Sequence, residues 1–285
     1  MNQLLDDLIK VMTLERLEMN LFRGESRDIG SPQVFGGQVL GQALVAATAT
    51  AEDRVAHSLH AYFLRRGDFN SPIVYEVDRA LDGKHFSSRR VVAIQHGRQI
   101  FNMSASFQLP ESGLEHQISM PDVPQPESLP DLESHYRSVA DKLPPAARRV
   151  LEQKRPFEFR PVQEPDEPRR EKSAPVKYIW FRAVDLLPGD EALHRCLLAY
   201  VSDFHLLATA LKPHGISMIN PKLVIASIDH AMWFHRGVRV DDWLLYAIDS
   251  PSASGARGFT RGSVFARDGR LVASAAQEGL IRVAS

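Results

Sequence analysis

The stretch His60-Ala61-Tyr62-Phe63-Leu64-Arg65-Arg66-Gly67 returns 170 positions later as His230-Ala231-Met232-Trp233-Phe234-His235-Arg236-Gly237. His-Ala and Arg-Gly keep the same places in both octets. Further along, His96-Gly97-Arg98 corresponds to Asp268-Gly269-Arg270 with a small change of offset. A spacing this long excludes a solenoid, whose units span about 20 to 50 residues. The sequence therefore predicts two similar domains packed as a pair within one chain.

The length of the chain is consistent with two folded domains, and its charge indicates that a ligand is recognised by a few local residues rather than by a general charge field. The chain has 285 residues, enough for two domains of about 100 to 200 residues each. Its formal net charge is -1, so no basic field indicates nucleic acid or an anionic membrane as a partner. The first residues lack the pattern of a signal peptide, and no apolar run approaches the roughly 18 residues of a membrane span. We expect a cytoplasmic protein.

Proline content marks the boundary between the two domains. The segment from Pro110 to Pro175 contains 12 of the 18 prolines, and it is also rich in charges. We predict an N-terminal domain over residues 1–110, an ordered proline-rich linker over 111–175 that lies on the surface, and a C-terminal domain over 176–285.

Each domain begins with an apolar helix and continues with strands rich in Val, Ile, Phe and Trp. The helices are predicted at Gly36–Ala47 and at Cys196–Leu211, the second ended by Pro213 and Gly215. Strands are expected at Val74–Val77, Val91–Ile94, Ile100–Gln108, Val224–Phe234, Trp243–Ile248, Gly258–Phe265 and Leu271–Ile281. The fold class is α+β, with each helix wrapped by an antiparallel sheet and the two sheets joined.

Several separated motifs in the same order resemble the acyl-CoA thioesterase II family over nearly the whole chain. They are Val34–Ala43, His57–Phe63, Leu198–Phe204, Ser227–Arg236 and Val272–Gly279. The resemblance implies a double hotdog fold and hydrolysis of medium- to long-chain fatty acyl-CoA to free acid and CoA. It also implies a homo-oligomer, a dimer or tetramer, and no cofactor.

The family's catalytic aspartate, hydroxyl residue and glutamine match Asp203, Ser227 and Gln277. Bacterial members of this family carry threonine at the hydroxyl position. Ser227 is therefore a departure from the family pattern, but serine keeps the same donor and acceptor oxygen. We expect Asp203 to act as the general base on a water that the other two side chains position, with backbone N–H groups near a helix start as an oxyanion site. Direct attack by Asp203, forming a mixed anhydride, remains an alternative.

Arginines near turns of the N-terminal domain are candidates for binding the phosphates of CoA, because guanidinium groups suit phosphate oxygens. They are Arg65, Arg66, Arg89 and Arg90, and a solvated charge cluster is the alternative interpretation. One cysteine, Cys196, excludes an internal disulfide and a cysteine-rich zinc site, and no His-Glu-x-x-His occurs, so no metal site is expected.

Two other functions compete with a thioesterase. One is a hotdog hydratase that acts on enoyl-CoA, and the other is a non-catalytic acyl-CoA sensor that would tolerate loss of Asp203. The absence of Gly-x-Ser-x-Gly argues against an α/β-hydrolase with a nucleophilic serine.

Overall fold

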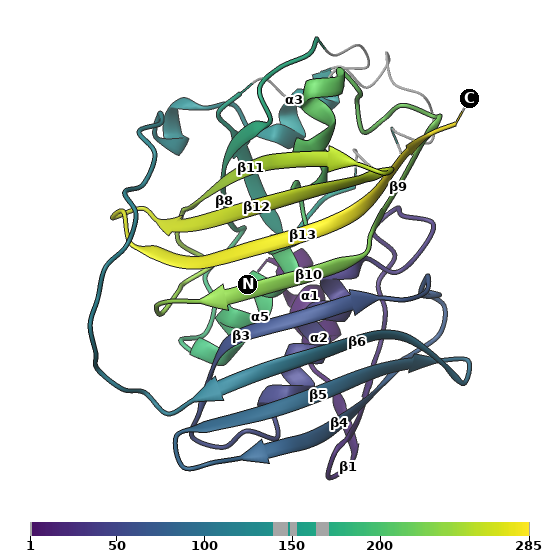
Figure 1. Ribbon diagram of the computed structural model, residues 1–285, viewed down its shortest axis with the longest axis vertical. Helices are drawn as coiled ribbons and strands as arrows, with labels where there is room; N and C mark the ends of the chain where they lie inside the picture. The colour runs from purple at the N-terminus through teal and green to yellow at the C-terminus, as the bar shows by residue number, and fades with distance from the viewer. Residues whose placement is uncertain (1, 139–147, 149–152, 164–170, 285) are drawn as a thin grey trace.

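One antiparallel sheet runs through the whole molecule and carries the main helices on one face. The computed structural model describes residues 2–138, 148, 153–163 and 171–284. Its 13-stranded sheet has the order β1-β2-β4-β5-β6-β3-β10-β13-β12-β11-β8-β7, with β9 paired to β13. Figure 1 shows α1, α2 and α5 behind this sheet, close to its middle. The prediction of two joined antiparallel sheets, each with a long helix, is confirmed.

The N-terminal half supplies the first six strands and two helices. They are α1 (Gln3–Met12), β1 (Glu15–Glu18), β2 (Leu21–Gly24), α2 (Gly36–Thr48), β3 (Val55–Phe63), β4 (Ile73–Asp82), β5 (Phe86–Gln95) and β6 (Arg98–Gln108). Ten of the 13 residues of α2 are buried, which explains why its sequence is apolar on nearly every side.

The C-terminal half repeats this order of helix and strands. Its elements are β8 (Val176–Ala183), α5 (Glu191–Ser202), the 3-10 helix η3 (Leu207–His214), β9 (Leu223–Ser227), β10 (Asp229–Phe234), β11 (Leu244–Ser254), β12 (Arg257–Ala266) and β13 (Leu271–Val283). No helix of the described residues is long and apolar enough to cross a membrane.

The predicted linker contains η1 (Pro126–Ser128), α3 (Leu132–Ser138) and the strand β7 (Phe157–Pro161). Figure 1 shows its first part following one edge of the molecule from the end of β6 toward η1. Because β7 pairs with β8, it completes the edge of the C-terminal sheet. Residues 139–147, 149–152 and 164–170 of the predicted linker lie outside the described residues.

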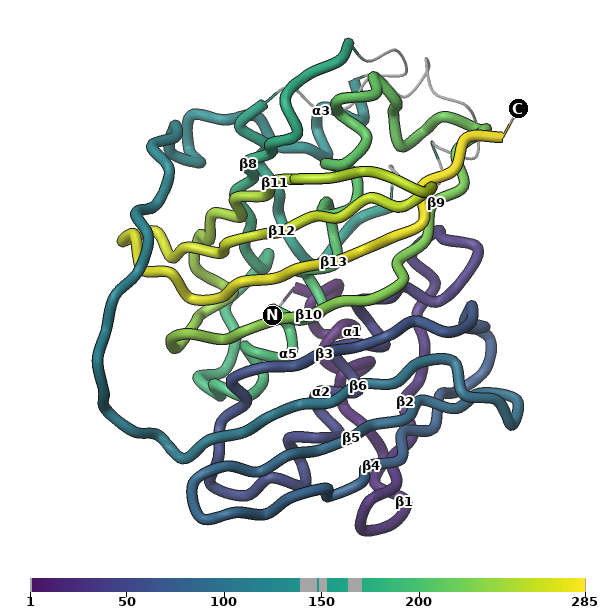
Figure 2. Tube along the Cα trace, in the orientation of Figure 1, coloured from purple at the N-terminus to yellow at the C-terminus, as the bar shows by residue number. Residues whose placement is uncertain are grey.

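The first residues of the two octets lie in β3 and β10, the strands that join the halves, as the Cα trace in Figure 2 also shows. β3 and β10 are antiparallel, with His230 opposite Ala61 and Ala231 opposite His60. His230 is therefore buried against the helices, whereas His60 lies on the outer face, where its ring meets Trp233 edge-on at 5.2 Å. The His-Ala match thus identifies the right strands, but the residues at a spacing of 170 face opposite sides of the sheet.

The helices α2 and α5 cross at very short range because α2 carries glycine at the contact. A Cβ atom on Gly37 would lie 2.2 Å from the carbonyl oxygen of Tyr200, and one on Gly41 would lie 3.1 Å from that of Cys196. Cys196 is buried in α5 as an apolar residue, and burial raises the pKa of its thiol to about 12. The glycines of α2 set how closely the two halves pack.

The second long helix differs from its prediction at both ends. It starts at Glu191, where the Asp190 side chain accepts a hydrogen bond from the backbone N–H of Ala192, and it ends at Ser202. His205 has φ of 70°, a left-handed conformation that interrupts the helix before η3 begins. Glycine usually marks such a stop, but histidine occupies it here, so the end of the helix could not be predicted from the residue type.

Replacing Gly37 with alanine is expected to lower the free energy of unfolding by about 1–3 kcal/mol, the usual cost of overpacking. The gain in helix propensity, about 1 kcal/mol, is smaller than the cost of moving a backbone carbonyl. Denaturant unfolding would measure the change. Gly113→Ala is the control, because nothing lies within 4 Å of its added Cβ; equal effects of the two substitutions would contradict the packing argument.

Candidate active site

Asp203, Ser227 and Gln277 meet at one point, although 74 residues separate the first from the last. Gln277 Nε2 donates hydrogen bonds to Asp203 Oδ1 at 2.7 Å and to Ser227 Oγ at 2.8 Å. Ser227 Oγ in turn donates to Asp203 Oδ1 at 3.4 Å. The three side chains that the sequence singled out thus form a closed triangle of hydrogen bonds.

Local structure explains how each of the three side chains reaches this point. Asp203 is the residue that caps the C-terminus of α5, so its side chain projects from the helix end. Ser227 ends β9, and the chain continues directly into β10, which also pairs with β13 and in addition pairs with β3. Gln277 lies on β13 with its side chain toward the helices and is 1% exposed. The buried amide is fixed, while Asp203 and Ser227 keep partial access to solvent.

The start of α2 lies directly against the carboxylate of Asp203. A Cβ atom on Gly36 would be 2.8 Å from Asp203 Oδ2, so only a glycine leaves this oxygen accessible. The first N–H groups of a helix have no acceptor within the helix and carry its positive dipole end. A negative charge that develops near Asp203 Oδ2 would therefore lie at the N-terminus of α2, a helix of the N-terminal half, whose free N–H groups and dipole favour an anion.

A cavity of about 260 Å³ opens beside Ser227 and Gly36. Apolar side chains form much of its wall, namely Val34, Val39, Phe63, Leu64, Ile100, Phe101, Ile225 and Ala226. Arg65 and Arg66 also line it, and both are exposed. Arg65 donates a hydrogen bond to the carbonyl oxygen of Gln99. An apolar interior with two cations at its border suits a ligand that has an apolar and an anionic part.

The other two arginines lie elsewhere. The prediction that Arg89 contacts CoA is wrong, because its side chain is buried and 2% exposed. Its guanidinium donates to the carbonyl oxygen and hydroxyl of Thr50 and to the carboxylate of Asp82. Arg90 is exposed on the opposite face of β5 and does not line the cavity beside Ser227. Its contact with CoA stays a prediction.

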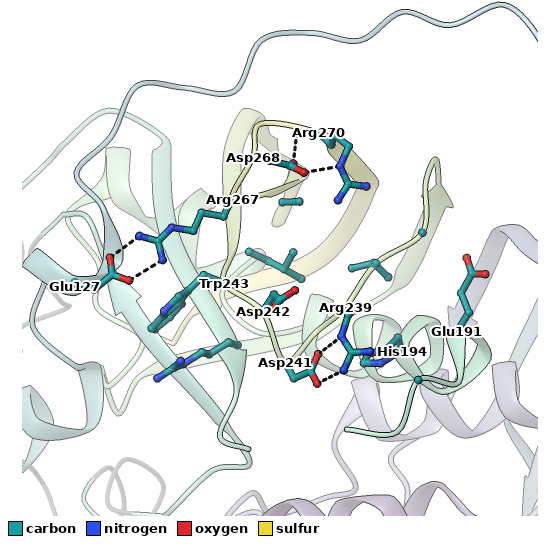
Figure 3. Close-up of a pocket in the computed structure, with 16 residues that line it drawn as sticks. Glu127, Glu191, His194, Arg239, Asp241, Asp242, Trp243, Arg267, Asp268 and Arg270 are labelled. Carbon is teal, nitrogen blue, oxygen red and sulfur yellow. Dashed lines mark hydrogen bonds and ion pairs between the residues drawn. The ribbon is translucent and has the colours of Figure 1, made fainter. Parts of the chain in front are cut away.

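A second cavity, of about 730 Å³, occupies the corresponding place in the C-terminal half (Figure 3). It lies at the first turn of α5, beside Glu191 and His194, and at the end of the second octet. Figure 3 shows three pairs of its charged side chains bonded to each other: Arg267 with Glu127, Arg239 with Asp241 and Arg270 with Asp268. Because these three arginines are already paired with carboxylates and Asp203, Ser227 and Gln277 lie elsewhere, this cavity does not have the features of the reaction site.

Comparison with known proteins agrees with these features. Residues 23–108 match the model of an acyl-CoA thioesterase N-terminal domain, and residues 150–280 match that of an acyl-CoA thioesterase. "Acyl-CoA thioesterase 2" of Haemophilus influenzae is 44% identical over 283 residues, which are 99% of each chain. The chain belongs to the acyl-CoA thioesterase II family.

Two further relatives cover most of the chain. Human "Acyl-coenzyme A thioesterase 8" is 42% identical over 96% of this chain and 88% of its own length. The crystal structure of the acyl-CoA thioesterase II TesB2 from Mycobacterium marinum has a TM-score of 0.80 and 41% identity, covering 98% of this chain and 99% of its own. A hot dog fold protein from Alicyclobacillus acidocaldarius, with a TM-score of 0.77 and 18% identity, shares the architecture. The predicted double hotdog fold is confirmed.

Proposed function

We propose that this protein hydrolyses medium- to long-chain fatty acyl-CoA to free fatty acid and CoA, with Asp203 as the general base. The observation that supports this proposal most strongly is the hydrogen-bonded triangle of Asp203, Ser227 and Gln277 beside the start of α2. Both bonds to the carboxylate go to Oδ1. Oδ2, which faces Gly36, is therefore the oxygen left to take a proton from water.

In the proposed reaction, a water molecule attacks the thioester carbonyl carbon as its proton moves to Asp203 Oδ2. Ser227 Oγ and the Gln277 amide hold the carboxylate and the water in line, which replaces a bimolecular encounter by a fixed geometry. Backbone N–H groups at the start of α2, near Gly36, stabilise the oxyanion of the tetrahedral intermediate. The C–S bond then breaks, and the CoA thiolate takes the proton back from Asp203.

The cavity beside Ser227 supports an assignment of the two parts of the substrate. Its apolar wall, which includes Phe63 and Phe101, suits aliphatic chain that leaves water on binding. Arg65 and Arg66 suit the phosphates of the CoA portion. The cytoplasmic location expected from the sequence and the homo-oligomer implied by the resemblance both stay predictions.

Asp203→Asn is expected to lower kcat/KM for palmitoyl-CoA and octanoyl-CoA by about 10²- to 10⁴-fold, the usual contribution of a general base. The amide cannot accept the proton of the attacking water. Free thiol release measures the reaction. Equal rates for the wild type and the variant would exclude Asp203 as the base, and binding of acyl-CoA without thiol release by the wild type would favour the sensor. Hydration of an enoyl-CoA without thiol release would favour the hydratase.

A single turnover in ¹⁸O-labelled water distinguishes direct water attack from an acyl-aspartyl intermediate that is hydrolysed at the aspartyl carbon. Direct attack places one labelled oxygen in the fatty acid and none in the protein. A mixed anhydride that is hydrolysed at the aspartyl carbon transfers the label to Asp203. Mass spectrometry of the peptide that contains Asp203, after one turnover with enzyme in excess, is expected to show no label. Label in this carboxylate would overturn the direct mechanism.

Arg66→Ala is expected to raise the KM for acyl-CoA about two- to fivefold, because an exposed charge pair with phosphate contributes at most roughly 1 kcal/mol. The KM for the matching acyl-pantetheine, which lacks the nucleotide phosphates, is expected to stay unchanged. Arg90→Ala is the control, since Arg90 is exposed on β5 and does not line the cavity. Equal effects of the two substitutions on acyl-CoA would contradict the assignment.

A further inference from the structure

The last residue of α5, directly before Asp203, is held by side chains from two different strands. The Tyr246 hydroxyl, from β11, donates a hydrogen bond to the carbonyl oxygen of Ser202 at 3.1 Å. His230 Nε2, from β10, lies 3.0 Å from Ser202 Oγ. All three residues are buried, with exposed fractions of 2% or less. Since none of them lines the cavity beside Ser227, they reach the reaction only through Ser202.

The charge state of these groups fits a structural hydrogen bond rather than proton transfer. Burial lowers the pKa of His230 to about 4, although the charge of Asp203 acts in the opposite direction. Burial and the charge of Asp203 both raise the pKa of Tyr246. The imidazole is therefore neutral and the phenol protonated near neutral pH, and both lie close enough to Asp203 to sense its charge.

The pattern of donors and acceptors assigns a direction to the histidine contact. Ser202 Oγ faces two groups that can only accept, the carbonyl oxygen of Ala199 at 2.9 Å and Met232 Sδ at 3.1 Å, and its single proton is used on these acceptors. His230 Nε2 then carries the proton and donates to Ser202 Oγ. The other nitrogen, Nδ1, is buried without a hydrogen-bond partner within the described part of the chain. An unpaired buried polar atom costs about 1–3 kcal/mol, so an apolar side chain here would be the more stable choice if packing were the only requirement.

The place of these contacts decides what they control. The helix ends at Ser202, and His205 already has the left-handed backbone, so the chain changes direction within three residues. Asp203 lies inside that change of direction. Its carboxylate must stay within hydrogen-bond distance of Gln277 while Oδ2 faces Gly36. A shift of the Ser202 backbone would move the carboxylate away from both.

We propose that His230 and Tyr246 are positioning residues that fix Ser202 and thereby aim the carboxylate of Asp203. The proposal rests on the function proposed above, in which Asp203 is the base. Positioning predicts a loss in kcat with little change in KM, because the groups that line the cavity are untouched. A displacement of about 1 Å at a reacting group costs up to about 10²-fold in rate.

The test uses Ser202→Ala and Tyr246→Phe, each of which removes one oxygen, together with His230→Leu and His230→Gln. We expect Ser202→Ala, Tyr246→Phe and His230→Leu to lower kcat for palmitoyl-CoA about 10- to 100-fold with KM changed less than about twofold. His230→Gln places an amide donor near the position of Nε2, so it is expected to recover a large part of the loss. Thermal unfolding identifies temperatures at which every variant is folded.

A matched control is available on the same helix. His194 is 1% exposed in the first turn of α5, where its ring contacts the carbonyl oxygen of Pro188 and accepts from the N–H of Val240. It binds the end of α5 that is remote from Asp203. His194→Leu is expected to lower the melting temperature and to leave kcat of the folded enzyme within about twofold. An equal loss of kcat in His194→Leu and His230→Leu would overturn the proposal.

Combination with Asp203→Asn separates this proposal from the proposed function. If Ser202 acts through Asp203, Ser202→Ala causes no further loss in the Asp203→Asn background. Unchanged kcat in Ser202→Ala, together with an inactive Asp203→Asn, would overturn the positioning role alone. The same fold-loss in both backgrounds would also overturn it. A fully active Asp203→Asn would instead overturn the base assignment and the positioning role with it.

Discussion

The pairing of β3 with β10 is the interaction on which the rest of the structure depends. It joins two half-sheets into one, and it fixes the two helices behind them at a single distance and angle. The glycines of α2 allow the two helices to pack this closely, because Gly37 has no side chain to clash with the carbonyl oxygen of Tyr200. The same approach brings Gly36 to Asp203. A strand register in the middle of the sheet thus determines the geometry of a site at the end of a helix.

The duplication provides two comparable cavities, and their chemistry has diverged. The one at the start of α2 has a glycine at the first helical position and an apolar wall. The one at the start of α5 has Glu191 at the first helical position, bonded to Arg195, and its border carries paired charges. The proposed water attack uses an accessible helix start and a free carboxylate oxygen, and the first cavity is the one beside the helix start that contacts Asp203.

Much of the fold and of the site follows from the sequence, and the failures have physical causes. Periodicity and the repeat predict the order of helix and strands in both halves, and the resemblance predicts the three clustered side chains. The end of α5 was missed because a histidine, His205, adopts the left-handed conformation that glycine usually marks. The burial of Arg89 rather than Arg90 had no signal, because both faces of β5 combine an arginine with apolar residues: Val91 and Ala93 share the face of Arg89, and Val92 and Ile94 share the face of Arg90. The proximity of Gly36 to Asp203 had none, because it arises only when the halves pack.

Because Gly36 contacts Asp203, enzymatic activity depends on whether the two halves have docked. One residue belongs to the N-terminal half and the other to the C-terminal half, so neither half contains a complete site. A chain whose halves fold separately but fail to dock would keep its secondary structure and still be inactive. During biosynthesis the N-terminal half would leave the ribosome without Asp203, the proposed base, so activity would require that β10 has first paired with β3.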